Sequence, residues 1–228
     1  MKFHYTDLET CHDATGMVII IDVIRAFTNA AFAFGQGAEK IIPVSSVDEA
    51  LELKRQLPNA MACGEVGGLP PEEFDFGNSP AQILSLDLRG KTLIQRTGAG
   101  TQAVTRSVNA KDMLAASFVV AGATVRYAQK LSPKTVTFVV SGQTSTHDGE
   151  EDLACAEYLE ALLREKSPDV KPFLECARRS SDAQLHYDPT KPQFLETDIL
   201  HCTSVDKFNF AMPIEKENGR HAMRPVFS

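Results

Sequence analysis

Short apolar runs alternate with amphipathic segments along most of the chain. Residues 17–21 are all apolar and lead into Asp22, which is typical of a strand buried on both faces of a parallel sheet. The alanine-rich residues 28–38 that follow contain glycine near their end, as helices often do. Further strand-and-helix pairs are predicted at residues 40–44 and 45–57, 91–97 and 98–107, 111–117 and 118–131, and 134–142 and 150–166, with another strand at 60–63. This alternation predicts an α/β fold, with a mainly parallel sheet and helices on both faces.

The helix and strand signals weaken after about residue 167. Residues 182–214 still contain enough apolar side chains to pack along the sheet. A chain of 228 residues lies within the size range of one α/β domain. We therefore expect a single compact domain over residues 1–228 with an irregular C-terminal segment.

Composition narrows the classes of partner. The formal charge is -7 and no basic block is present, which argues against nucleic acid or an anionic membrane as a partner. The five cysteines are scattered without a C-x-x-C pair, as in reduced cytoplasmic proteins, and neither a signal peptide nor an apolar run of ~20 residues is evident. We expect a cytoplasmic protein that binds a small anionic molecule. The alanine-rich residues 118–131 suit either packing on the sheet or a homo-oligomer interface, and this stays open.

Loops that follow parallel strands are the expected ligand site, because they converge at one edge of the sheet. Asp22 suits a hard cation and Arg25 can bind phosphate or carboxylate oxygens, although the two could instead form a local ion pair. The loop over residues 64–80 is rich in glycine, proline and acid, and it offers Glu65 directly after a strand. Asn78 lies near its end, and Ser79 before Pro80 is predicted to cap a helix.

The turn over residues 97–103 fits the loose G-x-G-x-x-A pattern at Gly98, Gly100 and Ala103. No acid follows about 20 residues later to hold a ribose, so the turn suits one phosphate better than a dinucleotide. Thr97 and Thr101 would add hydroxyl donors. The alternative is that these glycines only form a tight turn.

Acidic residues gather at the start of the helix predicted at residues 150–166. Glu151 and Asp152 belong to a cluster that either complements the helix dipole or forms an oxygen-rich Mg²⁺ site. His147 nearby is either an acid-base group or a solvated loop residue. Cys155 has no histidine at a recognisable spacing and is expected to be a packed thiol.

Taken in order and spacing, four segments resemble the magnesium-dependent 2-phosphosulfolactate phosphatase family over nearly the whole chain. They are DVIRAFT, GEVGGLPPEEFDFGNSP, RTGAGTQ and EDLACA, and a fifth segment near the end, DILHCTSVDKFNFAMPI, agrees more weakly. The resemblance implies hydrolysis of a phosphomonoester to phosphate and a 2-hydroxy acid, which is sulfolactate in the family's named reaction, part of coenzyme M biosynthesis. The chain departs from many members at Gly98–Thr101, where they have threonine, asparagine, glycine and threonine, so the substrate itself stays open.

The resulting hypothesis assigns roles by position. Mg²⁺ is assigned to Asp22, Glu65, Glu151 and Asp152, and catalysis to Asp22, Arg25, Glu65 and Asp152. Substrate binding is assigned to Arg25, Asn78, Ser79, Thr97, Gly98, Gly100 and Thr101. Attack by water and a phosphoenzyme on Ser79 or Thr101 both remain open. Three alternative functions also remain open. The protein could be a phosphatase for another phosphorylated hydroxy acid, a non-catalytic binder of anionic phosphorylated metabolites, or a dinucleotide-dependent enzyme.

Overall fold

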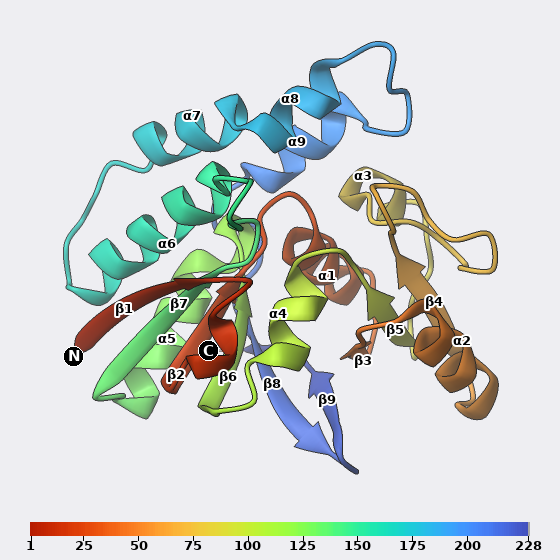
Figure 1. The fold of residues 1–228 in the computed structure, drawn as a ribbon, viewed down its shortest axis with the longest axis horizontal. Helices are drawn as coiled ribbons and strands as arrows, with labels where there is room; N and C mark the ends of the chain where they lie inside the picture. Colours follow the sequence, from red (N-terminus) through yellow and green to blue (C-terminus); the bar gives the residue numbers. More distant parts are fainter. Residues whose placement is uncertain (228) are drawn as a thin grey trace.

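A ten-stranded sheet forms the centre of the computed structural model, which describes residues 1–227 (Figure 1). The strand order is β1-β7-β2-β6-β8-β9-β3-β5-β4, and β10 pairs with β8. The strands are β1 (Lys2–Asp7), β2 (Gly16–Ile21), β3 (Lys40–Pro43), β4 (Ala60–Gly64), β5 (Thr92–Arg96), β6 (Ala110–Ala116), β7 (Thr135–Val140), β8 (Phe210–Glu217), β9 (Arg220–Met223) and β10 (Val226–Phe227). The predicted fold class is confirmed.

The helices alternate with strands β2 to β7 and then follow one another. They are α1 (Ala26–Gly35), α2 (Val47–Gln56), α3 (Pro80–Ile83), α4 (Gly100–Arg106), α5 (Ala121–Leu131), α6 (Glu150–Leu163), α7 (Lys171–Arg179), α8 (Ser181–Tyr187) and α9 (Glu196–Cys202). Short 3-10 turns occupy Cys11–Asp13 and Phe118–Val120. Among residues 1–227, no helix combines the length and the apolar character that crossing a bilayer requires.

The sheet contains two blocks of parallel strands. One block is β1, β7, β2 and β6, and the other is β3, β5 and β4. The antiparallel hairpin of β8 and β9 joins them, because β8 pairs with β6 and β9 pairs with β3. The C-terminal part of the chain is therefore built into the middle of the sheet.

Strand β2 shows why its sequence is continuously apolar. Met17, Ile19 and Ile21 pack in a core cluster with residues of α5 and α6, while Val18 and Ile20 pack in a second cluster with residues of α1 and α4. Both faces of the strand are therefore covered, as expected for a central parallel strand.

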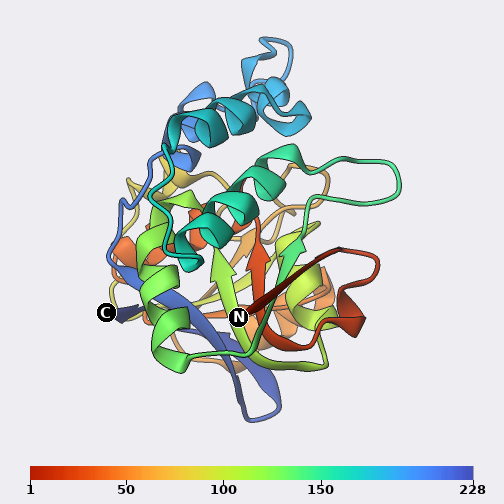
Figure 2. The same ribbon diagram turned by 90° about the vertical axis from the view of Figure 1, so that its left-hand side faces the viewer.

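The C-terminal segment is more regular than its sequence predicts. It forms α7, α8 and α9, which lie above the ends of the central strands in Figures 1 and 2, followed by β8, β9 and β10. The edge strand β1 was also not predicted, because most of its side chains are exposed or half-buried and its sequence lacks an apolar run. The alanine-rich α5 buries Ala121, Ala123 and Ala128 and packs on the sheet, which is one of the two arrangements expected from the sequence. The other, a homo-oligomer interface, stays a prediction.

Candidate active site

A cavity of about 290 Å³ lies at the carboxyl ends of β2, β4 and β5. The predicted site residues that line it are Asp22, Arg25, Glu65, Asn78, Thr97 and Gly98. The C-terminal segment adds Asp182, Leu185, His186 and Phe194. A larger cavity of about 340 Å³ beside β6, β8 and α5 contains none of the predicted site residues.

Asp22 links the starts of two helices. It directly follows β2 and is buried, and its Oδ1 accepts a 2.7 Å hydrogen bond from Ala26 N–H at the start of α1. Its Oδ2 accepts a 2.8 Å hydrogen bond from Gly100 N–H at the start of α4. A Cβ atom at position 100 would lie 2.7 Å from that oxygen, so glycine is required for the close approach.

Glu65 holds the long loop of residues 64–80 against the turn after β5. Its Oε2 accepts a 2.7 Å hydrogen bond from Gly68 N–H, and its Oε1 accepts one from Gly98 N–H. Gly64 before it has a φ of 124°, and a Cβ there would overlap the carbonyl oxygen of Arg96. Glycine at this point therefore allows Glu65 to leave the strand toward the cavity.

Glu151 and Asp152 converge from the first turn of α6. Asp152 accepts a 2.7 Å hydrogen bond from Val23 N–H and a 2.8 Å hydrogen bond from Gly142 N–H, which ties the ends of β2 and β7 together. A Cβ on Gly142 would lie 3.2 Å from both Glu151 Oε1 and Asp152 Oδ2, so these two oxygens face the same space. Glu151 is buried, and its Oε2 has no hydrogen-bond partner among residues 1–227.

The buried acids disfavour one another's ionisation. Burial raises the pKa of Asp22 to about 6, with further contributions from Glu65 and Asp182, although the N–H groups it binds act in the opposite direction. Burial and then the charge of Asp182 raise the pKa of Glu151 to about 7. Burial, Glu151 and Asp22 raise the pKa of Asp152 well above its ordinary value. A bound cation would relieve this repulsion.

These acids fit a cation that keeps much of its water. Residues 1–227 contain no group of three or more His, Cys, Asp or Glu side chains arranged to hold a metal ion. Mg²⁺ often uses only one or two carboxylates and takes its other ligands from water and phosphate. Glu151 Oε2 has no hydrogen-bond partner among residues 1–227, and burial together with the charge of Asp22 raises the pKa of Glu151, so this carboxylate suits such an ion.

Arg25 forms a buried ion pair, but with a residue far along the chain. Its Nη1 lies 2.9 Å from Asp198 Oδ2 on α9. Arg25 therefore pairs with Asp198, and the local ion pair with Asp22 considered from the sequence does not form. Ser79 Oγ donates to Asp198 Oδ1 at 2.7 Å and accepts a hydrogen bond from Gln82 N–H at 3.3 Å. Ser79 is therefore the predicted cap of α3, and it is buried outside the cavity lining.

The turn after β5 is closed upon itself. Thr97 N–H donates to Thr101 Oγ1 at 2.8 Å, and Thr101 N–H donates to Thr97 Oγ1 at 3.2 Å. Gly98 N–H and Gly100 N–H bind the carboxylates of Glu65 and Asp22. Backbone donors that the sequence assigns to phosphate are thus occupied by acids of the protein, and Gly100 and Thr101 do not line the cavity. This arrangement does not favour dinucleotide binding.

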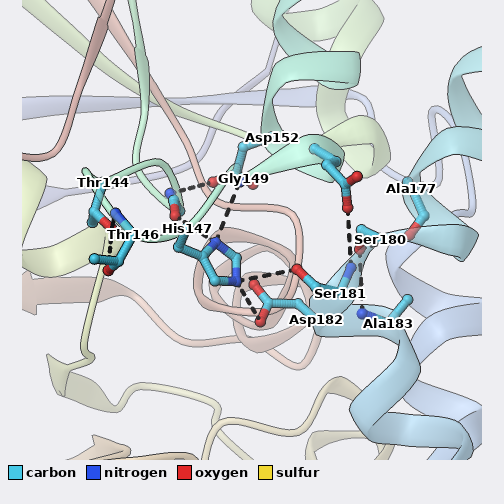
Figure 3. Close-up of polar contacts among 12 residues, drawn as sticks. Thr144, Thr146, His147, Gly149, Asp152, Ala177, Ser180, Ser181, Asp182 and Ala183 are labelled. Carbon is cyan, nitrogen blue, oxygen red and sulfur yellow. Dashed lines mark hydrogen bonds and ion pairs between the residues drawn. The ribbon is translucent and has the colours of Figure 1, made fainter.

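His147 connects the loop before α6 to α8, as Figure 3 shows. Its Nε2 lies 3.2 Å from Ser181 Oγ and 3.4 Å from Asp182 Oδ1. Its Nδ1 lies 2.9 Å from the carbonyl oxygen of Gly142. His147 is therefore more constrained than a solvated loop residue, and it holds Asp182 beside the cavity.

Sequence reasoning missed the contributions of the C-terminal segment, which are Asp182, His186, Phe194 and Asp198. One local signal indicates the start of α8, which carries Asp182 in its first turn. Ser180 is a typical cap residue, and it accepts a hydrogen bond from Ala183 N–H at 3.2 Å. His186 Nδ1 lies 2.8 Å from the carbonyl oxygen of Leu195, and burial lowers its pKa.

Other residues with an open role serve the fold. Asp75 accepts a 2.7 Å hydrogen bond from Ala62 N–H and pairs with Lys54 at 2.9 Å, outside the cavity lining. Cys155 is fully buried, and burial raises its pKa well above the ordinary value, as expected for a packed thiol.

The mainly parallel sheet and the acid-lined cavity at its strand ends define an α/β protein with a polar candidate site. The chain belongs to the 2-phosphosulfolactate phosphatase family, since the pattern of the family described as 2-phosphosulpholactate phosphatase matches residues 3–217. Members of this family are phosphoric monoester hydrolases, so the family and the enzyme class predicted from the sequence are confirmed.

Individual relatives agree with this assignment. A protein of Carboxydothermus hydrogenoformans is 41% identical over 201 residues, covering 87% of this chain and 79% of its own. A protein of Bacillus subtilis is 34% identical over 202 residues and one of Thermus thermophilus is 36% identical over 216 residues, each covering 87% of both chains. All three carry the name "Probable 2-phosphosulfolactate phosphatase".

Proposed function

We propose that this protein is a Mg²⁺-dependent phosphatase that removes phosphate from a small, multiply anionic 2-hydroxy acid, with 2-phosphosulfolactate as the first candidate. The observation that carries the proposal is the position of Arg25 in the cavity beside buried Asp22. Glu151, with its unpartnered carboxylate oxygen, and Asp152 lie outside the cavity lining, but the charge of Asp22 acts on both. The family membership supports the reaction class.

The charge of the cavity supports the need for a cation. Within residues 1–227, the lining contains Asp22, Glu65 and Asp182 but only one arginine or lysine, Arg25. A substrate that carries a phosphate, a carboxylate and a sulfonate would be repelled by these acids. A divalent cation would reverse that repulsion, and Asp22 with the Glu151–Asp152 pair would hold it, in part through water.

The chain's own residues then perform distinct tasks. Bound Mg²⁺ supplies charge stabilisation at the phosphoryl oxygens. The N–H groups of Arg25 that Asp198 leaves free are placed to donate to phosphoryl oxygens, which gain stabilisation as the bond to the leaving oxygen breaks. Burial raises the pKa of Asp22 to about 6 without a bound cation, and an ionised Asp22 can accept a proton from an attacking water near neutral pH.

The surroundings of the two hydroxyl candidates support water over a phosphoenzyme. Ser79 Oγ donates to buried Asp198, and Thr101 Oγ1 donates to the carbonyl oxygen of Thr97 at 3.1 Å. Neither residue lines the cavity. A water molecule in the cavity is therefore the nucleophile in this scheme.

A phosphate-release assay tests the proposal. The purified protein is mixed with 2-phosphosulfolactate, and in parallel with 2-phospholactate and 2-phosphoglycerate, with Mg²⁺ or with excess chelator. We expect release that requires the metal and is fastest for one of these phosphorylated hydroxy acids. Thermal stabilisation by the same compounds without any phosphate release would identify a binder instead, and release unaffected by the chelator would exclude the metal.

A further inference from the structure

Asp198 is a fully buried carboxylate in α9 that binds two separate parts of the candidate active site. Its Oδ2 accepts from Arg25 Nη1 at 2.9 Å. Its Oδ1 accepts from Ser79 Oγ at 2.7 Å and from Ala81 N–H at 3.1 Å. The side chain is 0% exposed, so these contacts exclude water.

Such burial is costly unless every oxygen of the carboxylate is bound. Asp198 meets this condition by using one donor from the loop after β2 and two donors from the start of α3. The three donors lie more than 100 residues away along the chain, since the sequence separations are 173, 119 and 117. The carboxylate therefore fixes the relative positions of Arg25 and the end of the 64–80 loop.

Arg25 is also held on other sides by residues of the cavity wall. Its guanidinium carbon lies 5.3 Å from the centre of the Phe194 ring, and its Nη2 lies 3.5 Å from the carbonyl oxygen of Gly68. Gly68 has a φ of 86°, and a Cβ there would overlap the Phe194 ring, so glycine lets the ring reach this position. The guanidinium is thus restrained by a carboxylate at one edge and an aromatic ring over one face.

We propose that Asp198 is a positioning residue for phosphate binding: it orients Arg25 toward the cavity and fixes the start of α3 at the cavity wall. The inference rests on the proposed function, because it takes Arg25 as a ligand of the phosphoryl group. It makes α8, α9 and the loop between them part of the active site. A guanidinium that is already oriented loses less freedom when it binds phosphate, so Asp198 acts on affinity through Arg25.

The test compares four variants of the full-length protein, Asp198→Asn, Ile199→Ala, Arg25→Gln and the double variant Arg25→Gln/Asp198→Asn. Ile199 is buried in the same helix and makes no side-chain polar contact, so its truncation loosens α9 without changing the contacts of Arg25. The measurements are kcat and KM for 2-phosphosulfolactate, the inhibition constant of inorganic phosphate, and the melting temperature.

We expect Asp198→Asn to raise KM and the phosphate inhibition constant by ~10- to 100-fold, while Ile199→Ala changes both less than about twofold at a similar loss of melting temperature. In the Arg25→Gln background, the second substitution should add less than about twofold, because Asp198 no longer has a guanidinium to orient. Equal effects of Asp198→Asn and Ile199→Ala would overturn the inference, as would an undiminished effect of Asp198→Asn in the Arg25→Gln background.

The double variant removes both charges and leaves no unpaired buried ion, so it keeps the test valid if Asp198→Asn alone does not fold. Absence of turnover in the wild type would overturn the proposed function alone. In that case calorimetric titration of the same variants with inorganic phosphate decides whether Asp198 positions Arg25.

Discussion

Asp22 Oδ2 accepts a 2.8 Å hydrogen bond from the backbone N–H of Gly100, which joins the end of β2 to the start of α4. The same carboxylate binds Ala26 N–H at the start of α1. These donors favour the ionised form, but burial dominates and raises the pKa to about 6. Asp22 is therefore both a structural link between three elements and an acid that changes its charge close to neutral pH.

The first prediction concerns Asp22→Asn. Asparagine keeps the shape but loses the charge, so we expect phosphate release to fall by ~10²- to 10⁴-fold. The free energy of unfolding should fall by about 1–3 kcal/mol, because one of the two N–H groups loses its acceptor. Phosphate release and urea unfolding measure the two effects.

Asp75→Asn is the matched control for this variant. Asp75 also accepts a backbone hydrogen bond, from Ala62 N–H, but it is an exposed residue outside the cavity lining. The control should lose stability and keep its turnover. Near-normal phosphate release by Asp22→Asn would remove Asp22 from the proposed mechanism.

The second prediction concerns the acid limb of the pH profile. In the wild type with Mg²⁺ bound, kcat/KM should rise below about pH 6 as Asp22 loses its proton, because burial raises the pKa of Asp22 to about 6 without a cation and a bound cation lowers it again. The negative charge of Asp182 raises the pKa of Asp22, so Asp182→Asn should lower that pKa and move the acid limb to lower pH. Asp188→Asn, at a half-buried position in the following loop and outside the cavity lining, serves as the control and should leave the limb in place. A limb that stays fixed or moves upward in Asp182→Asn would show that Asp22 does not govern it.

Local sequence patterns predicted most of the fold. Ser79 caps α3, as its position before Pro80 predicts, and the helix predicted within residues 45–57 begins at a cap in which Ser46 accepts a hydrogen bond from Glu49 N–H at 3.2 Å. The expected convergence of strand-ending loops is also found, since Asp22 reaches Gly100 and Glu65 reaches Gly98. Such features follow from short-range spacing and from the geometry of parallel strands, which a sequence carries directly.

The remainder depends on contacts between distant parts of the chain. Nothing near Asp198 indicates that it meets Arg25, which lies 173 residues away. Glu65 and Asp22 accept hydrogen bonds from Gly98 N–H and Gly100 N–H, donors that the sequence assigns to a ligand. These contacts also depend on how the loops pack. A helix start predicts available N–H donors, but only the tertiary structure decides which acceptor they bind.

The third prediction concerns the pH dependence of stability without a divalent cation. Folding raises the pKa of Glu151 from 4.5 to about 7, so the folded state binds more protons between these values. The free energy of unfolding should therefore decrease as pH rises through this window, by up to about 3 kcal/mol. Glu151→Gln removes the contribution of this residue and should make the decrease smaller, as measured by urea unfolding across the window. Asp22 and Asp152, whose pKa values are also raised, supply the remainder. Glu150→Gln, on the exposed side of the same turn, should leave the decrease unchanged.

The fourth prediction concerns stabilisation by Mg²⁺. A cation that binds only the folded protein at about 100 times its dissociation constant adds about 2.7 kcal/mol to the free energy of unfolding. We expect such a gain in the wild type above pH 7, where Glu151 is ionised, and its loss when a chelator is added. Glu151→Gln should lose most of the gain, because the variant lacks the carboxylate whose Oε2 has no partner within residues 1–227, whereas Glu150→Gln should retain it. Thermal unfolding with a series of Mg²⁺ concentrations measures the effect, and equal stabilisation of both variants would exclude Glu151 from the cation site.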